Sequence, residues 1–218
     1  VNQNEIFYRL RMPWVRQLNE NGYKVYAVVA SGAWNDRIEA GGAEYVEWKL
    51  SRSGRNPLAE FGSVLDLRNI FKRIKPDIVQ NFHTKPNIYA PIAARLAGVP
   101  ITVSTVTGLG YTFVNRPGLG TRLAKRANLG MYLFANRLAN EVAFQNPDDL
   151  DLLRSKRGIP GSKGRFISGG SGIDIREYSP KTQDSDQSQS IRRSLGISPD
   201  AFVAMFVGRL QLDKGLVE

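Results

Sequence analysis

The stretch DIVQNFHTKPNIYAPIAARLAGVPITVST, residues 77–105, decides the fold that the sequence predicts. Two short runs rich in β-branched residues, Asp77–Asn81 and Ile101–Thr105, flank a longer segment of helical character, Asn87–Gly98. Gly98 and the proline two residues later are typical of the end of a helix. The order strand, helix, strand is typical of a parallel sheet that is covered by helices.

The same alternation runs through most of the chain. Further strands are predicted at Tyr23–Ala30, Ala43–Trp48, Glu141–Gln145 and Arg165–Ser168. Further helices are predicted at Glu5–Asn21, Leu58–Lys75, Gly118–Asn140 and Asp148–Lys156. The predicted fold class is therefore α/β, with a Rossmann-like, doubly wound parallel sheet and helices on both of its faces.

The composition indicates a soluble globular protein, because 42% of the 218 residues are hydrophobic and 23% are charged. The net charge of +10 favours phosphorylated substrates, anionic lipid surfaces or polyanions as partners. The chain has no cysteine and one histidine, which excludes disulfides and thiolate metal sites, and no metal is expected. No apolar run approaches the roughly 20 residues of a transmembrane helix, so any membrane contact is expected to be peripheral.

Polar and apolar stretches near the end of the chain predict a division into domains. Tyr178–Ser190 is rich in Ser, Pro, Asp, Gln and Lys and is typical of a linker or loop. Phe202–Val207 is a hydrophobic run typical of a strand that opens a new domain. We therefore expect a first domain over residues 1–180 with a truncated first strand, a linker over 181–201, and the truncated start of a second domain over 202–218.

The segment FVGRLQLDKG, residues 206–215, carries the clearest chemical pattern. Gly208 allows close backbone approach after the predicted strand, Arg209 supplies a forked guanidinium, and Lys214 supplies a point charge five residues later. This combination suits a diphosphate. Two solvated cations after an edge strand are the alternative.

Three segments together resemble the retaining glycosyltransferases of family 4, of the type that builds bacterial capsule, O-antigen and lipid-linked oligosaccharides. The first segment is Gly208–Leu210 with Asp213–Gly215. The second is Gly169–Asp174 followed by Tyr178–Pro180, in which serine stands at the usual place of asparagine. The third and longest is Asn81–Phe113. The resemblance implies the GT-B architecture, in which an acceptor-binding and a donor-binding domain face each other across a cleft.

The resemblance also implies roles for individual residues. Arg209 and Lys214 would hold the donor diphosphate and stabilise the leaving group, and His83 would contact the sugar near the reacting carbon without acting as a general base. The donor would be a nucleotide diphosphate sugar, with UDP expected, and no other cofactor is implied. Expected residues of the acceptor side and cleft are Thr107, Gly108, Gly110, Tyr111, Ser171 and Gly172.

Two features of the sequence leave alternatives for this site. A lone histidine is often a surface or satisfied core residue, and only the place of His83 at a strand end favours a role in the cleft. The loop Gly108–Phe113 is interpreted either as a flexible aromatic loop for sugar or lipid contact or as a loop that packs on the core.

The sequence departs from the family pattern at two places. The family's glycine turn is replaced by Asn2–Glu5, and its paired glutamates do not occur within the 218 residues.

The helix predicted at 118–140 has two distinct stripes. One is apolar and is expected to face the sheet: Leu119, Leu123, Ala127, Met131, Phe134 and Leu138. The other combines the cations Arg122, Lys125 and Arg126 with Leu129 and Leu133. Together with Arg116, this mixed face suits an anionic membrane surface or a lipid diphosphate acceptor. The alternative is a solvated face whose leucines pack on a neighbouring helix or another subunit.

The functional hypothesis is a retaining glycosyltransferase that moves a sugar from a nucleotide diphosphate sugar to a lipid-linked or glycan acceptor. A cytoplasmic location is expected, with peripheral contact at the inner face of the plasma membrane as an option, and the 218 residues alone are expected to be inactive. A UDP-sugar 2-epimerase of similar architecture is one alternative. A basic nucleic-acid-binding module is another, favoured only by the charge of +10.

Overall fold

The computed structural model describes residues 1–50, 57–109, 119–156, 158–173 and 186–208, and for residues 57 and 119–125 it describes the backbone alone. The chain divides into two compact units, Val1–Ile173 and Asp174–Glu218. Among the described residues no helix is long and apolar enough to cross a membrane.

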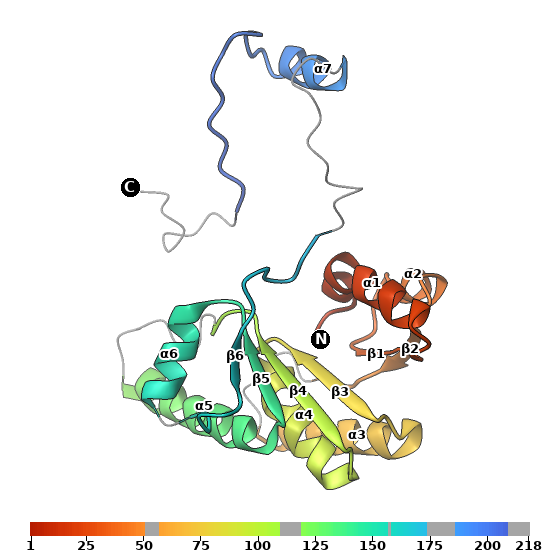
Figure 1. Ribbon diagram of the computed structural model, residues 1–218, viewed down its shortest axis with the longest axis vertical. Coiled ribbons are helices and arrows are strands. Elements are labelled where there is room, and N and C mark those ends of the chain that lie inside the picture. The colour runs from red at the N-terminus through yellow and green to blue at the C-terminus, as the bar shows by residue number, and fades with distance from the viewer. Residues whose placement is uncertain (51–56, 110–118, 157, 174–185, 209–218) are drawn as a thin grey trace. The chain divides into compact units, whose positions relative to one another are not determined.

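Helices and strands alternate along the first unit, which confirms the predicted α/β class (Figure 1). The helices are α1 (Asn4–Glu20), α2 (Asn35–Ala40), α3 (Pro57–Ile74), α4 (Thr84–Ala97), α5 (Leu119–Leu138) and α6 (Pro147–Ser155). The strands are β1 (Tyr26–Val29), β2 (Glu44–Glu47), β3 (Ile78–Phe82), β4 (Ile101–Val106), β5 (Glu141–Phe144) and β6 (Gly164–Phe166). The sequence prediction missed α2, whose six residues are too few to show a helical period.

The start of α4 differs from the prediction. The helix begins at Thr84, three residues before the expected start at Asn87. Pro86 lies in its first turn, where the missing N–H costs no helical hydrogen bond. The earlier start places His83 at the N-cap, directly between β3 and α4.

The strands form two parallel sheets, one with the order β1-β2 and one with the order β3-β4-β5-β6. Figure 1 shows α3, α4 and α5 along one face of the four-stranded sheet, and α4 packs against both of the other helices. Side chains of β1 alternate between two cores. Ala27 and Val29 belong to the core formed with α1 and α2, whereas Tyr26 and Val28 pack against the core formed with α3 and α4. Helices therefore cover both faces of the two-stranded sheet, as in a doubly wound fold.

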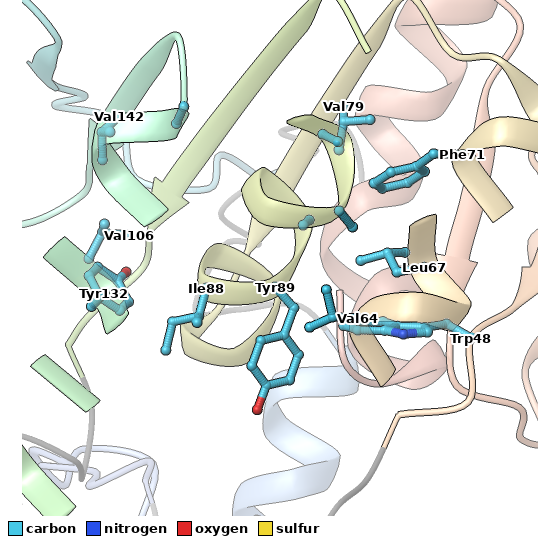
Figure 2. Close-up of a cluster of buried hydrophobic side chains, with 14 of the residues drawn as sticks. Trp48, Val64, Leu67, Phe71, Val79, Ile88, Tyr89, Val106, Tyr132 and Val142 are labelled. Carbon is cyan, nitrogen blue, oxygen red and sulfur yellow. The ribbon is translucent and has the colours of Figure 1, made fainter. Parts of the chain in front are cut away.

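The larger core contains side chains from both sheets and from the helices that pack on them, and Figure 2 shows part of it. Its labelled members are Trp48, Val64, Leu67, Phe71, Val79, Ile88, Tyr89, Val106, Tyr132 and Val142. Trp48 follows β2, lies edge-on to Tyr89 of α4 with ring centroids 6.4 Å apart, and donates its indole N–H to the Ser63 carbonyl of α3 at 2.9 Å. This indole joins the end of the two-stranded sheet to the helices of the four-stranded one.

A buried asparagine fixes α4 to the sheet. The Asn87 side-chain amide donates to the Thr105 carbonyl of β4 at 2.8 Å and to the Tyr132 hydroxyl of α5 at 3.2 Å. Asn87 is fully buried, and these bonds satisfy its side-chain NH2 group, while its Oδ1 is buried without a partner among the described residues. They hold the first turn of α4 close to the end of β4.

The orientation of α5 corrects the sequence prediction. The stripe expected to face the sheet includes Met131 and Phe134, which are 43% and 52% exposed. Tyr132, Ala135 and Ala139 are buried instead. Leu129 and Leu133, which were assigned to the cationic face, pack against the core. The buried face of α5 thus combines Tyr132 and Asn136 with the small Ala135, and α5 packs against α4, whose Ala90, Ala93 and Ala94 are also buried.

The second unit contains α7 (Asp186–Ser194) within the segment predicted to be a linker. The strand predicted at Phe202–Val207 is wrong, because this segment is neither helix nor strand. Phe202 is 96% and Val207 is 82% exposed. A strand forms only with a neighbour to accept and donate its backbone hydrogen bonds, and this segment has none among the described residues.

We expect Trp48→Ala to lower the free energy of unfolding by about 3–5 kcal/mol, because it removes a buried aromatic side chain from the larger core. Trp48→Phe retains most of the apolar contact but loses the bond to Ser63, so a smaller loss of about 1–3 kcal/mol is expected. Urea unfolding followed by circular dichroism measures both, with Trp34→Ala at a partly exposed indole as the control. Equal losses for Trp48→Ala and Trp34→Ala would contradict this packing role.

Candidate functional site

The carboxyl ends of four adjacent parallel strands meet at one edge of the sheet. His83 follows β3, Thr107 follows β4, Gln145 follows β5, and Ser171 lies in the turn that follows β6. The register pairs Phe82 with Thr105, so His83 and Thr107 leave neighbouring strands at nearly the same level. In open parallel sheets this edge lines the ligand crevice. Two residues of the sequence-predicted site, His83 and Thr107, are thus neighbours at the edge where a ligand is expected.

His83 has an unusual backbone. Its φ of 73° and ψ of 164° fall in a region that is populated almost only by glycine. Such a conformation costs on the order of 1–3 kcal/mol and is found mainly at active sites and ligand clamps. The His83 carbonyl accepts a hydrogen bond from the backbone N–H of Asn87 at 3.0 Å, which helps to hold the strained turn. Its side-chain Nδ1 is buried and has no hydrogen-bond partner among the described residues.

Burial lowers the pKa of His83 to about 4, and the positive charge of the Arg11 guanidinium acts in the same direction. The imidazole is therefore neutral at pH 7. A neutral ring presents one N–H donor and one nitrogen acceptor, which suits a hydroxyl of a sugar better than a second positive charge would.

The turn that carries Ser171 is held to two other segments. The Gln145 amide donates to the Ser171 hydroxyl at 3.0 Å, and the Trp14 indole of α1 donates to the Ser171 carbonyl at 3.3 Å. Gly170 and Gly172 have φ values of 56° and 71°, which residues with a side chain rarely adopt. The glycines thus allow this turn to reach α1, across a separation of 157 residues in the sequence.

The loop after β4 is tied to α6. Gly108 has a φ of 138°, and a side chain there would meet open space, so backbone conformation is what favours glycine. The Leu109 amide donates to the Asp149 carboxylate at 3.3 Å. Burial raises the pKa of Asp149, and the bond from Leu109 partly opposes this shift. This contact anchors the described end of the loop.

A polar cluster missed by sequence reasoning lies between α3 and α4. Lys85, two residues after His83, forms an ion pair with Glu60 at 3.0 Å, and the Tyr89 hydroxyl donates to the same carboxylate. Burial, with the bond to Glu60, raises the pKa of Tyr89. The charge of Lys85 is thus balanced within the fold. Glu60 lies on α3, and Lys85 and Tyr89 lie on α4, 25 and 29 residues later in the sequence. No local sequence pattern therefore indicates the cluster.

Several predicted site residues fall outside the described part of the chain. Arg209, Lys214, Gly110, Tyr111 and Arg116 lie outside the described residues altogether, and Arg122 and Lys125 lie in the part of α5 whose side chains are not described. Arg126 is exposed on α5. Gly208 is exposed in the second unit. The structure therefore brings together His83, Thr107, Gly108, Ser171 and Gly172, all in the first unit.

Two further features help to locate the site. An open hollow of about 560 Å³ lies at the amino ends of β1 and β2, lined among others by Asn19, Lys24 and Glu44, whereas His83 follows the carboxyl end of β3. Within the described ranges, no three histidine or acidic residues gather as metal ligands would, and the expectation of a metal-free site stays a prediction.

Comparison with known proteins decides the family. Residues 1–146 match the glycosyl transferase 4-like family, which is more than half of the chain. The chain belongs to this family.

Members and neighbours of this family are similar over much of the chain. The N,N'-diacetylbacillosaminyl-diphospho-undecaprenol alpha-1,3-N-acetylgalactosaminyltransferase of Campylobacter jejuni is 23% identical over 211 residues, which are 97% of this chain and 55% of that protein. The UDP-Gal:alpha-D-GlcNAc-diphosphoundecaprenol alpha-1,3-galactosyltransferase of Escherichia coli is 28% identical over 153 residues, 70% of this chain and 37% of that protein. The chain thus spans about half the length, or less, of these relatives.

A solved glycosyltransferase structure from Rickettsia africae superposes with a TM-score of 0.61 at 13% identity, covering 88% of this chain and 46% of that one. This likeness shows the Rossmann-like fold of a GT-B half.

We expect His83, the one histidine of the chain, to titrate near pH 4 instead of its ordinary value near 6.5. The unfolded chain takes up a proton below pH 6.5 and the folded chain only near pH 4, so stability is full above pH 6.5 and is lost as the pH falls toward 4. One pKa unit corresponds to about 1.4 kcal/mol, and partial exposure reduces the expected loss to about 1–2 kcal/mol.

The single Hε1 resonance of His83 measures this pKa by NMR, and urea unfolding at pH 7 and pH 4.5 measures the loss of stability. The variant His83→Gln serves as the control, because it lacks the titrating group and should show a correspondingly smaller loss. A midpoint near pH 6.5 would show that the imidazole is not desolvated.

Proposed function

We propose that this chain is part of a retaining glycosyltransferase that transfers a sugar from a UDP-sugar to a lipid-linked acceptor in bacterial surface polysaccharide assembly. The observation that carries the proposal is the family match, together with two relatives whose names state diphosphoundecaprenol-linked acceptors. One of these names also states a UDP-linked donor. Residues 1–180 form the acceptor-binding domain in this proposal, and residues 202–218 begin the donor-binding domain.

The edge formed by β3–β6 supports an acceptor role. Its side chains are a neutral imidazole, a hydroxyl and an amide, from His83, Ser171 and Gln145. Such groups hydrogen-bond sugar hydroxyls without demanding a charged partner. The strained turn at His83 supports a functional position, because strain of this kind persists where surrounding contacts and function require it.

Catalysis in this proposal relies on positioning and electrostatic stabilisation. Arg209 and Lys214 hold the donor diphosphate and stabilise the negative charge that develops on it as the bond to the sugar breaks. His83 contacts the sugar near the reacting carbon, and the leaving phosphate accepts the proton of the attacking hydroxyl. The nucleotide sugar is the donor substrate in this proposal, which includes no metal and no cofactor.

A UDP-sugar 2-epimerase remains the alternative on the same architecture. Both curated relatives named above are transferases, which favours transfer over epimerisation. The charge of +10 is the only support for nucleic-acid binding, and a phosphorylated lipid acceptor accounts for it equally well.

The test uses the full-length protein with a UDP-sugar and an undecaprenyl-diphosphate-linked sugar. We expect a new glycosidic bond with retained anomeric configuration, detected by mass spectrometry and NMR of the product. Arg209→Ala or Lys214→Ala should lower kcat by about 10²–10³-fold, as expected for the loss of one group that stabilises developing negative charge. The 218 residues alone should give no transfer. Release of free epimerised nucleotide sugar in place of product would overturn the proposal.

The proposal includes peripheral contact with an anionic membrane through α5, on the cytoplasmic side. Met131 and Phe134 form an exposed apolar stripe with the small Ala127, and Arg126 and Arg137 are exposed on the same helix. Apolar side chains bordered by cations suit the boundary between headgroups and acyl chains. Each cation near an anionic surface contributes about 1 kcal/mol.

We expect Phe134→Glu to reduce binding to vesicles that contain anionic lipid, because the change places a negative charge in the apolar stripe. Vesicle cosedimentation measures the effect, which should be at least about tenfold at low salt and smaller at high salt. Leu152→Glu, at a comparably exposed leucine of α6, is the matched control and should leave binding unchanged. Equal loss in both variants would mean that net charge, and not this stripe, governs the contact.

A further inference from the structure

Arg11 of α1 is a buried cation without a polar partner. Only 2% of its surface is exposed, and none of its Nε, Nη1 and Nη2 atoms has a hydrogen-bond partner among the described residues. The guanidinium lies 3.8 Å from the ring centroid of Phe82 and 5.8 Å from that of Trp14. Its faces thus meet aromatic rings, while the five N–H groups around its edge are left without acceptors.

The charge persists despite this burial. Desolvation lowers the pKa of Arg11 to about 10, so the group remains protonated at neutral pH. Contact with aromatic rings offsets part of the cost of burial, but it satisfies none of the N–H donors. No ion pair of the described residues includes Arg11. A buried, forked, positive group of this kind fits an anion with several oxygen acceptors.

The location of Arg11 favours a substrate anion. Phe82 is the last residue of β3, and His83 follows it with a strained backbone and an unpartnered Nδ1. Arg11 packs on Phe82, the residue before His83, and its charge helps to lower the pKa of His83, so the guanidinium lies near the carboxyl edge. This is the edge at which parallel α/β sheets bind their ligands.

We propose that Arg11 binds a phosphate group of a substrate at this edge, through paired N–H···O bonds from the edge of its guanidinium. The inference rests on the proposed function, because both substrates of that reaction carry a diphosphate. The chemistry is the same for the nucleotide donor and for the lipid-linked acceptor.

Entry of the phosphate requires a covering segment to move, because the guanidinium is buried. The turn that contains Ser171 is held by a hydrogen bond of 3.3 Å from Trp14 and one of 3.0 Å from Gln145, and Trp14 is an aromatic neighbour of Arg11. Gly170 and Gly172 give this turn conformational freedom. Its displacement would break these two bonds and would uncover Trp14 beside Arg11.

The experiment compares Arg11→Met with Arg9→Met in the 218-residue chain. Arg9 lies on the same helix, is exposed, and is paired with Glu5 at 2.9 Å, so its loss removes one positive charge away from the site. Inorganic pyrophosphate is titrated while the melting temperature and the Hε1 resonance of His83 are followed. We expect pyrophosphate to stabilise the wild-type chain and Arg9→Met, to shift the His83 resonance, and to bind Arg11→Met at least about tenfold more weakly.

Two further titrations separate the sources of the phosphate. UDP represents the donor and farnesyl diphosphate represents the acceptor, and the ligand whose affinity falls in Arg11→Met identifies the source. Arg11→Lys retains the charge without the fork and should bind with intermediate affinity. These readouts do not depend on turnover, so a failure of sugar transfer would leave the phosphate site intact and would count against the proposed function alone.

Arg11→Met is expected to fold, because replacing a buried unpaired charge by an apolar side chain of similar length is commonly neutral or stabilising. If the variant does not fold, the wild-type titration still decides, since pyrophosphate must shift the His83 resonance with the same affinity as it raises the melting temperature. Absence of pyrophosphate binding to the wild-type chain, or equal affinities in Arg11→Met and Arg9→Met, would overturn the proposal.

Discussion

The parallel pairing of β3 with β4 is the constraint on which the candidate site depends. The register aligns Phe82 with Thr105, and the Asn87 amide then reaches the Thr105 carbonyl from the first turn of α4. A shift of one residue would reverse which side chains of β3 face the helices, and would separate Asn87 from its acceptor. One register therefore sets the places of His83, of α4 and of the loop after β4.

Burial determines which side chains are charged at the carboxyl edge of the sheet as much as residue type does. A charged guanidinium and a neutral imidazole lie near this edge, at Arg11 and His83. Protonation of the imidazole would add a second positive charge there, which the low dielectric makes unfavourable. The cation of Lys85 is already balanced by Glu60. The edge thus offers one strong attraction for an anion beside uncharged groups that suit hydroxyls.

The order of the elements could be predicted from sequence, because β-branched runs and helix-ending signals such as Gly98 are local. The orientation of α5 could not, since Tyr132 and the small Ala135 are buried while the more hydrophobic Phe134 is half-exposed. The hypothesis for His83 rests on its place at a strand end, which the sequence does indicate. The contact of Arg11 with Phe82 joins residues 71 positions apart on different elements, so it depends on tertiary structure that no local pattern encodes.

The backbone at residue 83 has a consequence for how the protein changes on binding. A turn held in a region that only glycine favours stores conformational energy comparable to that of a hydrogen bond. A ligand that bonds the unpartnered Nδ1 of His83 would compensate that energy. Without such a bond, the strained backbone of His83 favours a change toward a more common conformation. The apo and liganded forms are therefore expected to differ first at the junction of β3 and α4, and only afterwards at the surrounding helices.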